Sequence, residues 1–210
     1  MCNKKETQLA RDFLNLNIIV GKLVSIMDIF EAIEKRRSIR KFKHEPMTEE
    51  HLMKILEAGR LAPSGGNRQP WYFIVVRDLE TKEAVSASSK SERNQELLSN
   101  ADTIIVLASN PELEKGHRSQ HICSERSWYK QDPMLAGEHM VLAATALGYG
   151  TCWVSGFDDF EVKKILKIPE NLAVIALIPI GTPDESPPPR ALLERKEIFF
   201  KDYFGIPLEL

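Results

Sequence analysis

The sequence predicts a fold of the α+β class, because strand-like and helix-like segments both occur along one chain of 210 residues. Four short segments, mostly apolar or aromatic, are predicted to be strands: 71–76, 103–108, 150–155 and 172–180. Longer segments around them begin with residues that cap helices and then place apolar side chains on one helical face. A chain of this length suits one compact domain with a substantial core.

Two helices are predicted near the start of the domain. Asp28 and Glu31 have the spacing of a capping box, in which both side chains bond free backbone N–H groups of the first turn. Thr48 is a typical N-cap, and the glutamates after it favour the positive end of the helix dipole. Residues 39–42, between the two helices, alternate like an extended segment. The second helix is predicted to face the core through Leu52, Ile55, Leu56 and Gly59.

The longest helix is predicted to follow Pro133, which is placed near its start, and to end at Gly148. Many of its residues are small, which allows a helix to approach its neighbours closely. We therefore expect this helix to be buried at the centre of the domain.

The remaining segments are less regular. Residues 81–100 are polar and are predicted to be helical or irregular. Residues 158–161 repeat the capping-box pattern, ahead of a helix that stops before Pro169. The proline-rich stretch 183–189 is expected to be a stiff surface segment. The aromatic tail 197–204 cannot form a core of its own, so we expect it to pack on something else, and a partner subunit is a good candidate.

The composition excludes several classes of function. The formal net charge of -2 favours neither nucleic acid nor an anionic membrane as the main partner. The apolar stretch 13–27 is interrupted by polar residues and is too short to span a bilayer. The three cysteines fit no zinc ribbon or disulfide framework. A reducing, cytoplasmic setting is the simpler interpretation.

We divide the chain into an N-terminal extension, 1–26, and a domain, 27–210. Two interpretations of the extension stay open. It is either a mildly amphipathic helix that packs on a partner, or a segment outside the domain that precedes the first strong helix signal at Met27.

The first candidate site is an arginine cluster formed by Arg36, Arg37, Ser38 and Arg40. Guanidinium groups this close repel one another unless an anion or carboxylates offset the charge. Arginine binds phosphate through a planar fork of N–H donors, and serine adds a hydroxyl donor. The alternative is a solvated charged turn whose arginines pair with Glu31, Glu34 or Glu45.

The second candidate site is the loop that contains Pro63, Ser64, Gly65 and Asn67. Glycine lets a backbone approach a flat ligand closely. The amide of Asn67 offers both a donor and an acceptor, as the edge of a pyrimidine ring requires. The alternative is an ordinary turn between a helix and a strand that begins with a core tryptophan, Trp71.

Other patterns do not support a site. Residues 148–157 are glycine-rich, but they run from helix to strand, the reverse of a dinucleotide-binding fingerprint. His117 and His121 would share one helical face and could hold a metal with Cys123 nearby, but the metalloprotease pattern fails. We expect no metal site and single out no catalytic triad.

Four motifs together resemble the FMN-dependent nitroreductase family over residues 27–198. They are 36–42 (RRSIRKF), 62–71 (APSGGNRQPW), 146–153 (ALGYGTCW) and 180–183 (IGTP). The resemblance implies a mixed, largely antiparallel central β-sheet flanked by helices. It also implies an interwoven homodimer with FMN in two sites at the interface.

The resemblance assigns a role to each site residue. It implies that the arginine cluster holds the phosphate, the ribityl chain and the ring edge, with Arg190 helping at the phosphate. Pro63, Ser64 and Gly65 would come from the other subunit, and Asn67 would face the flavin. The segment near the reactive ring nitrogen would be Trp153, Val154, Ser155 and Gly156.

The implied activity is transfer of hydride from NADH or NADPH, through FMN, to a small acceptor such as a nitroaromatic compound or a quinone. No side chain need act as an acid or base, so no catalytic residue is named. Ser155 departs from the glutamate of some relatives, which leaves the acceptor open. The alternatives are a specialised flavin enzyme of the same superfamily, a reductive dehalogenase or flavin-modifying enzyme, and a non-catalytic flavin-binding protein.

Overall fold

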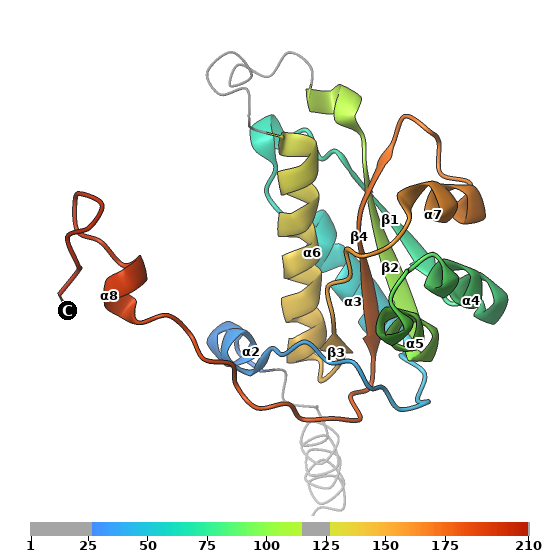
Figure 1. The fold of residues 1–210 in the computed structure, drawn as a ribbon, viewed down its shortest axis with the longest axis horizontal. Coiled ribbons are helices and arrows are strands. Elements are labelled where there is room, and N and C mark those ends of the chain that lie inside the picture. Colours follow the sequence, from blue (N-terminus) through green and yellow to red (C-terminus); the bar gives the residue numbers. More distant parts are fainter. Residues whose placement is uncertain (1–26, 115–126, 210) are drawn as a thin grey trace, which may run out of the picture.

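The computed structural model describes residues 27–114 and 127–209, and a four-stranded antiparallel sheet forms its centre (Figure 1). The strands lie in the order β1 (Trp71–Val76), β2 (Thr103–Ser109), β4 (Ala173–Gly181) and β3 (Gly150–Thr151). Each strand is antiparallel to its neighbour. All the residues of β2 are buried, so both faces of the sheet are covered at its centre.

Helices cover both faces of the sheet. Helices α3 (Glu49–Arg60) and α6 (Trp128–Ala146) lie on one face, and α4 (Leu79–Ala87), α5 (Glu92–Asn100) and α7 (Asp159–Leu166) lie on the other (Figure 1). Successive side chains of a strand point to opposite faces. Accordingly, Ile104 and Val106 belong to the core cluster under α4, α5 and α7, while Ile105 and Leu107 belong to the cluster under α3 and α6. The α+β prediction is confirmed.

The segment after helix α2 (Ile29–Lys35) runs along the edge strand β3. Ser38 forms an isolated parallel bridge with Thr151, and Phe42 forms an antiparallel bridge with Pro183. The expected extended segment therefore extends the sheet at its β3 edge, and the Ser38 bridge is a parallel pairing in a sheet whose strands are otherwise antiparallel.

The central helix α6 approaches its neighbours closely, as its small residues predict. A Cβ added to Gly59 of α3 would collide with the side chain of Met140, and one added to Gly137 would collide with the Trp153 ring. The helix begins at Trp128, before the predicted start, so Pro133 lies inside it. At the sixth position of the helix, a proline removes one backbone hydrogen bond and its ring crowds the carbonyl four residues earlier.

The third strand is shorter than predicted. The sequence predicts a strand over 150–155, but only Gly150 and Thr151 form β3. Beyond them, the N–H of Cys152 donates to the carbonyl of Pro179 at 3.3 Å, and Val154 forms an isolated bridge with Leu177. Pro179 has no N–H to return, so the ladder is interrupted at this point.

The predicted N-caps are confirmed. The first capping box is only half formed, because the Glu31 side chain bonds another residue and not the N-cap backbone. Asp28 accepts from the N–H groups of Phe30 and Glu31, and Thr48 accepts from that of His51. The carboxylate of Glu31 instead accepts from Lys35 Nζ at 2.6 Å. One side chain at each cap is enough to start these helices.

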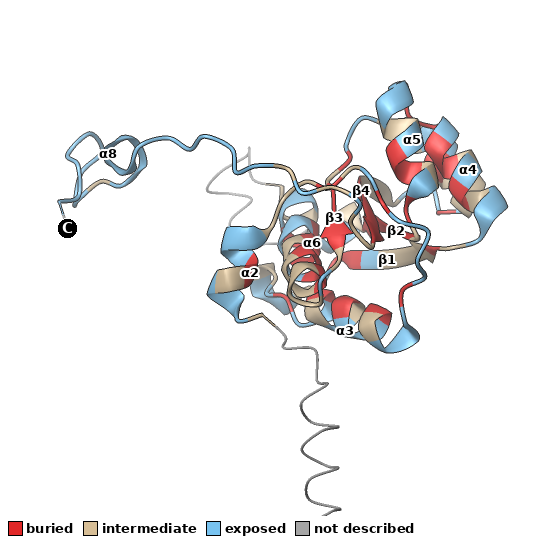
Figure 2. Cartoon of the chain, turned by 90° about the horizontal axis from the view of Figure 1, so that it is seen from below, coloured by how far each residue is buried: buried red, intermediate tan, exposed pale blue. Residues whose placement is uncertain are grey.

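The C-terminal arm, residues 184–209, extends away from the domain (Figures 1 and 2). It contains the short helix α8 (Arg195–Ile198), and nearly all of its side chains beyond Arg190 are exposed. Phe204 is 92% exposed. The predicted packing partner of the aromatic tail is therefore not the core of the same chain. Within the described ranges, no helix is long and apolar enough to cross a membrane.

Candidate functional site

The arginine cluster lies against β3 and the residue that follows it. The N–H of Ile39 donates to the carbonyl of Thr151 at 2.8 Å. Burial raises the pKa of the Cys152 thiol, while the nearby Arg40 guanidinium and Ser38 hydroxyl act in the opposite direction. Ser38 and Arg40 are thus held beside residue 152, near the end of the third predicted motif.

The three guanidinium groups of the cluster differ in their partners. Arg37 donates to the carbonyls of Glu34 at 2.6 Å and Arg36 at 2.8 Å. Arg40 donates through Nη1 to the carbonyl of Ser38 at 3.1 Å, and its backbone N–H donates to Glu185 Oε1. No arginine of the cluster forms an ion pair with a carboxylate from the described part of the chain. The cluster therefore keeps positive charge available for an anion.

The loop 63–70 holds an unusual backbone conformation. The φ angles of Gly66, Asn67 and Gln69 are 60°, 55° and 48°. Residues other than glycine rarely adopt this region, and such strain often occurs at functional sites. Side chains hold the loop: the N–H of Gln69 donates to Ser64 Oγ at 3.0 Å, and the Gln69 amide donates to Asn67 Oδ1 at 3.2 Å.

The loop is also tied to α6 by a residue that the sequence does not single out. The backbone N–H of Gly65 donates to Oδ2 of Asp132 at 3.0 Å, and Asp132 is buried within the first two turns of α6. A lone aspartate within an apolar helical pattern carries no signal of this long-range contact.

The two predicted halves of the site lie at opposite ends of α6. The loop is held at Asp132, whereas Met27 contacts Ala146 at the far end, close to the arginine cluster. At about 1.5 Å per residue, the helix between Asp132 and Ala146 spans roughly 20 Å. The structure does not bring Pro63, Ser64, Gly65 and Asn67 next to the cluster of the same chain.

The segment 153–157 exposes backbone donors. The indole of Trp153 donates to Glu138 Oε2 of α6 at 3.3 Å, and the N–H of Val154 is paired with Leu177. Beyond this point Ser155 and Gly156 are exposed. The N–H groups of residues 155, 156 and 157 have no acceptor among the described residues. These three N–H groups, here called the free amide run, are available to a ligand.

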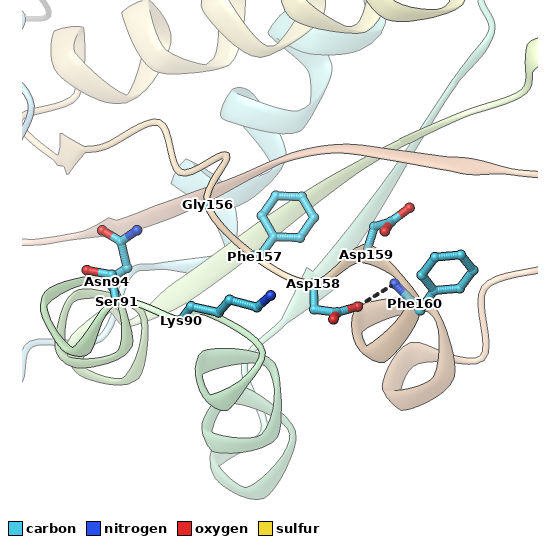
Figure 3. Close-up of a pocket in the computed structure, with 8 residues that line it drawn as sticks. All are labelled: Lys90, Ser91, Asn94, Gly156, Phe157, Asp158, Asp159 and Phe160. Atoms are coloured by element: carbon cyan, nitrogen blue, oxygen red, sulfur yellow. Dashed lines mark hydrogen bonds between the residues drawn. The ribbon is translucent and has the colours of Figure 1, made fainter.

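A cavity of about 510 Å³ adjoins this segment, between the start of α5 and the start of α7 (Figure 3). The turn between α4 and α5 borders it and contacts the segment directly. Ser89 Oγ donates to the carbonyl of Gly156 at 2.7 Å. Sequence reasoning missed this contact because residues 81–100 are polar and contain several serines and asparagines that look alike in the sequence.

The other predicted residues have no clear place in this arrangement. Arg190 is exposed on the C-terminal arm. His117, His121 and Cys123 lie outside the described residues. Among the residues that are described, no group of three or more His, Cys, Asp or Glu side chains is arranged to hold a metal.

Comparisons with known proteins identify the family of the chain and agree with its fold. The model of the nitroreductase family matches residues 33–182. An NADH dehydrogenase of Thermus thermophilus is 30% identical, over 81% of this chain and 95% of that protein. A nitroreductase family protein of Clostridium novyi NT has a TM-score of 0.70 and 35% identity, covering 86% of this chain and 97% of the other. An FMN-dependent nitroreductase of Clostridium difficile has a TM-score of 0.70 and 30% identity, covering 83% and 99%.

Proposed function

Because the chain belongs to the nitroreductase family, we propose that it is an FMN-dependent oxidoreductase that transfers hydride from NADH or NADPH to a small acceptor. Nitroaromatic compounds and quinones are the acceptor classes to test first. The observation that carries this proposal is the placement of an arginine cluster beside the strand that leads into the free amide run. Its guanidinium groups form no ion pair with a carboxylate of the described residues. A flavin mononucleotide offers an anion at one end and hydrogen-bond acceptors at the other.

The residues present fit the phosphate end of FMN. Arg36 is half-buried, and its guanidinium group has no partner among the described residues. Arg40 and Ser38 are half-buried beside β3, so their donors are positioned by the sheet edge. Arg37 already donates to two carbonyls and would contribute mainly charge. Arg190 would join the phosphate site if the arm that carries it folds toward a cluster.

The residues present also fit the ring end. The free amide run offers donors to ring acceptors, and Trp153 and Val154 hold it against α6 and β4. Bound FMN would supply the redox chemistry, accepting hydride from the nicotinamide and passing it to the acceptor. The chain would bind the flavin and place positive charge near its ring edge, which favours the anionic reduced form. No side chain is assigned as an acid or base.

We further propose that the protein is a homodimer in which a partner completes each site. The loop of one chain lies roughly 20 Å along α6 from the arginine cluster of the same chain, so Pro63, Ser64, Gly65 and Asn67 would serve the cluster of the partner. An apolar cavity of about 360 Å³ lies where α2, α3 and α6 meet. Ile29 lines this cavity, and its neighbour Phe30 is also exposed. We propose that the exposed apolar arm of a second copy packs on this surface.

The test is turnover and flavin content of the purified protein. We expect a yellow protein that oxidises NADH or NADPH when a nitroaromatic compound or a quinone is present. Flavin reduction by dithionite but by neither nicotinamide would favour the specialised flavin enzyme. Bound FMN without reduction of any acceptor would favour a flavin-binding protein without turnover. A well-folded, colourless protein that takes up no added FMN would overturn the proposal.

A further inference from the structure

A chain of hydrogen bonds that passes through the buried Ser89 connects α5 to the free amide run. Gln95 of α5 donates through Nε2 to the carbonyl of Ser89 at 2.6 Å. Ser89, which is 1% exposed, donates through Oγ to the carbonyl of Gly156 at 2.7 Å. The same hydroxyl lies 3.4 Å from the N–H of Ser91, which donates to it. The Ser89 side chain is therefore committed to one orientation, toward Gly156.

A second tether acts on the same segment two residues later. The N–H of Asp158 donates to the carbonyl of Ser88 at 2.9 Å. Asp158 in turn caps α7 through its carboxylate, which accepts from the N–H of Phe160 (Figure 3) and from that of Glu161. The backbone on both sides of Phe157 is thus held against the turn between α4 and α5.

These tethers determine where the last N–H of the free amide run, that of Phe157, points. The peptide bond between Gly156 and Phe157 is trans, so its carbonyl and its N–H point in opposite directions. Because the carbonyl is directed at Ser89, the N–H of Phe157 is directed away from the α4–α5 turn. Rotating this peptide would break the Ser89 bond and leave a buried hydroxyl without its acceptor, which costs free energy.

The turn itself is firmly anchored. Leu97 and Leu98 of α5 are buried in the core cluster, and Val85 of α4 joins the same cluster. Ser88 and Ser89 are themselves buried, so their side chains are largely shielded from water. The core side chains of α4 and α5 therefore hold the turn in place, and the turn holds the Gly156 peptide through the bond from Ser89.

We propose that Ser89, held by Gln95, is a positioning residue that orients the peptide of Gly156 and so sets how the free amide run meets the flavin ring. This proposal rests on the proposed FMN site. It extends that site to two residues that touch neither the cofactor nor a substrate. It assigns a role to the polar segment 81–100, for which the sequence offers none.

The experiment compares Ser89→Ala, Ser89→Thr and Gln95→Met with the wild-type holoprotein. Ser86→Ala is the matched control, because Ser86 is also buried and its hydroxyl bonds only the Lys82 carbonyl within α4. FMN affinity is measured by fluorescence titration, and the flavin midpoint potential by equilibration with a reference dye. Thermal unfolding without FMN reports on the fold.

Loss of one neutral hydrogen bond should weaken FMN binding about threefold to tenfold in Ser89→Ala. The same factor, acting on the ratio of affinities for oxidised and reduced FMN, shifts the potential of a two-electron couple by about 15–30 mV. Ser89→Thr, which keeps the hydroxyl, should restore both values, and Ser86→Ala should change neither. Gln95→Met should act in the same direction with a smaller effect, and it decides the question if Ser89→Ala does not fold.

Unchanged affinity and potential in Ser89→Ala would overturn this inference while leaving the FMN assignment intact. Equal shifts of FMN affinity and potential in Ser89→Ala and Ser86→Ala would also overturn it. The effect would then come from a general loss of protein stability and not from the orientation of the Gly156 peptide. If the wild-type protein itself takes up no FMN, the proposed function fails first, and the inference falls with it.

Discussion

Asp132 and Gly65 are joined by a hydrogen bond of 3.0 Å between a buried carboxylate of α6 and the backbone N–H of the strained loop. This bond fixes the loop to the end of the central helix that lies farther from the arginine cluster. It therefore contributes both to the shape of the loop and to the separation of the two halves of the site within one chain.

Replacing Asp132 with Ala should destabilise the protein and loosen the loop. The N–H of Gly65 loses a charged acceptor in a half-buried setting, and such a loss costs about 1–3 kcal/mol. The free energy of unfolding, measured with urea, checks the effect. Asp159→Ala is the control, since its contact with Lys163 on α7 is long, at 3.9 Å, and partly exposed. Equal losses in both variants would contradict the role given to Asp132.

The double variant Arg36→Ala with Arg40→Ala should lose FMN while the fold survives. Each charge-assisted contact to a phosphate contributes about 1.5–3 kcal/mol, so binding should weaken roughly a hundredfold or more. Titration of the apoprotein with FMN measures this, and circular dichroism checks the fold. Arg60→Ala, which removes an exposed arginine paired with Glu57, is the control. Unchanged flavin affinity in the double variant would show that the cluster is not the phosphate site.

Deleting residues 191–210 should convert the proposed dimer to a monomer and weaken FMN binding with it. The deletion removes exposed apolar side chains, among them Leu192, Tyr203 and Phe204, but keeps Arg190. Sedimentation equilibrium gives the oligomeric state. Phe160→Ser changes an equally exposed aromatic residue on α7 and should leave the dimer intact. A truncated protein that remains dimeric would contradict the role of the arm.

The Cys152 thiol should react slowly with alkylating reagents in the folded protein at pH 8. Burial raises the pKa of this thiol, so less thiolate is present than at an ordinary cysteine. Since the folded state holds the proton more tightly, Cys152 contributes stability that is complete below the ordinary thiol pKa and is lost as the pH rises toward the raised value. Peptide mapping by mass spectrometry after timed labelling measures the rate. Labelling of Cys152 as fast as in urea would contradict the prediction.

Local features of the fold could be predicted because their causes lie within a few residues. Thr48 caps α3 through a bond to the N–H of His51, and the apolar run from Trp71 to Val76 forms β1 with the predicted bounds. The third strand could not be predicted in the same way. Its length depends on Pro179, which lies far away in sequence and faces Cys152 only after β3 and β4 pair.

The candidate site likewise has a part that the sequence could predict and a part that it could not. The arginines of residues 36–40 stand together in the sequence, so their shared charge is visible before folding. The tie between Gly65 and Asp132, and the bond between Ser89 and Gly156, join residues whose types are common at any surface. Only burial distinguishes them from solvated polar groups, and burial is a property of the packed chain.

By itself the sequence determined the starts of α2, α3 and α7, the central strands and the family of this protein, because each depends on residue types at short spacing or on motifs that stand together. The tertiary structure alone decided that the arginine cluster and the loop 63–70 lie at opposite ends of α6. It also decided that Ser89, in the turn between α4 and α5, bonds the carbonyl of Gly156. Those relationships arise from how α6 and the sheet pack. Short-range patterns carry no information about contacts that close only when distant segments meet.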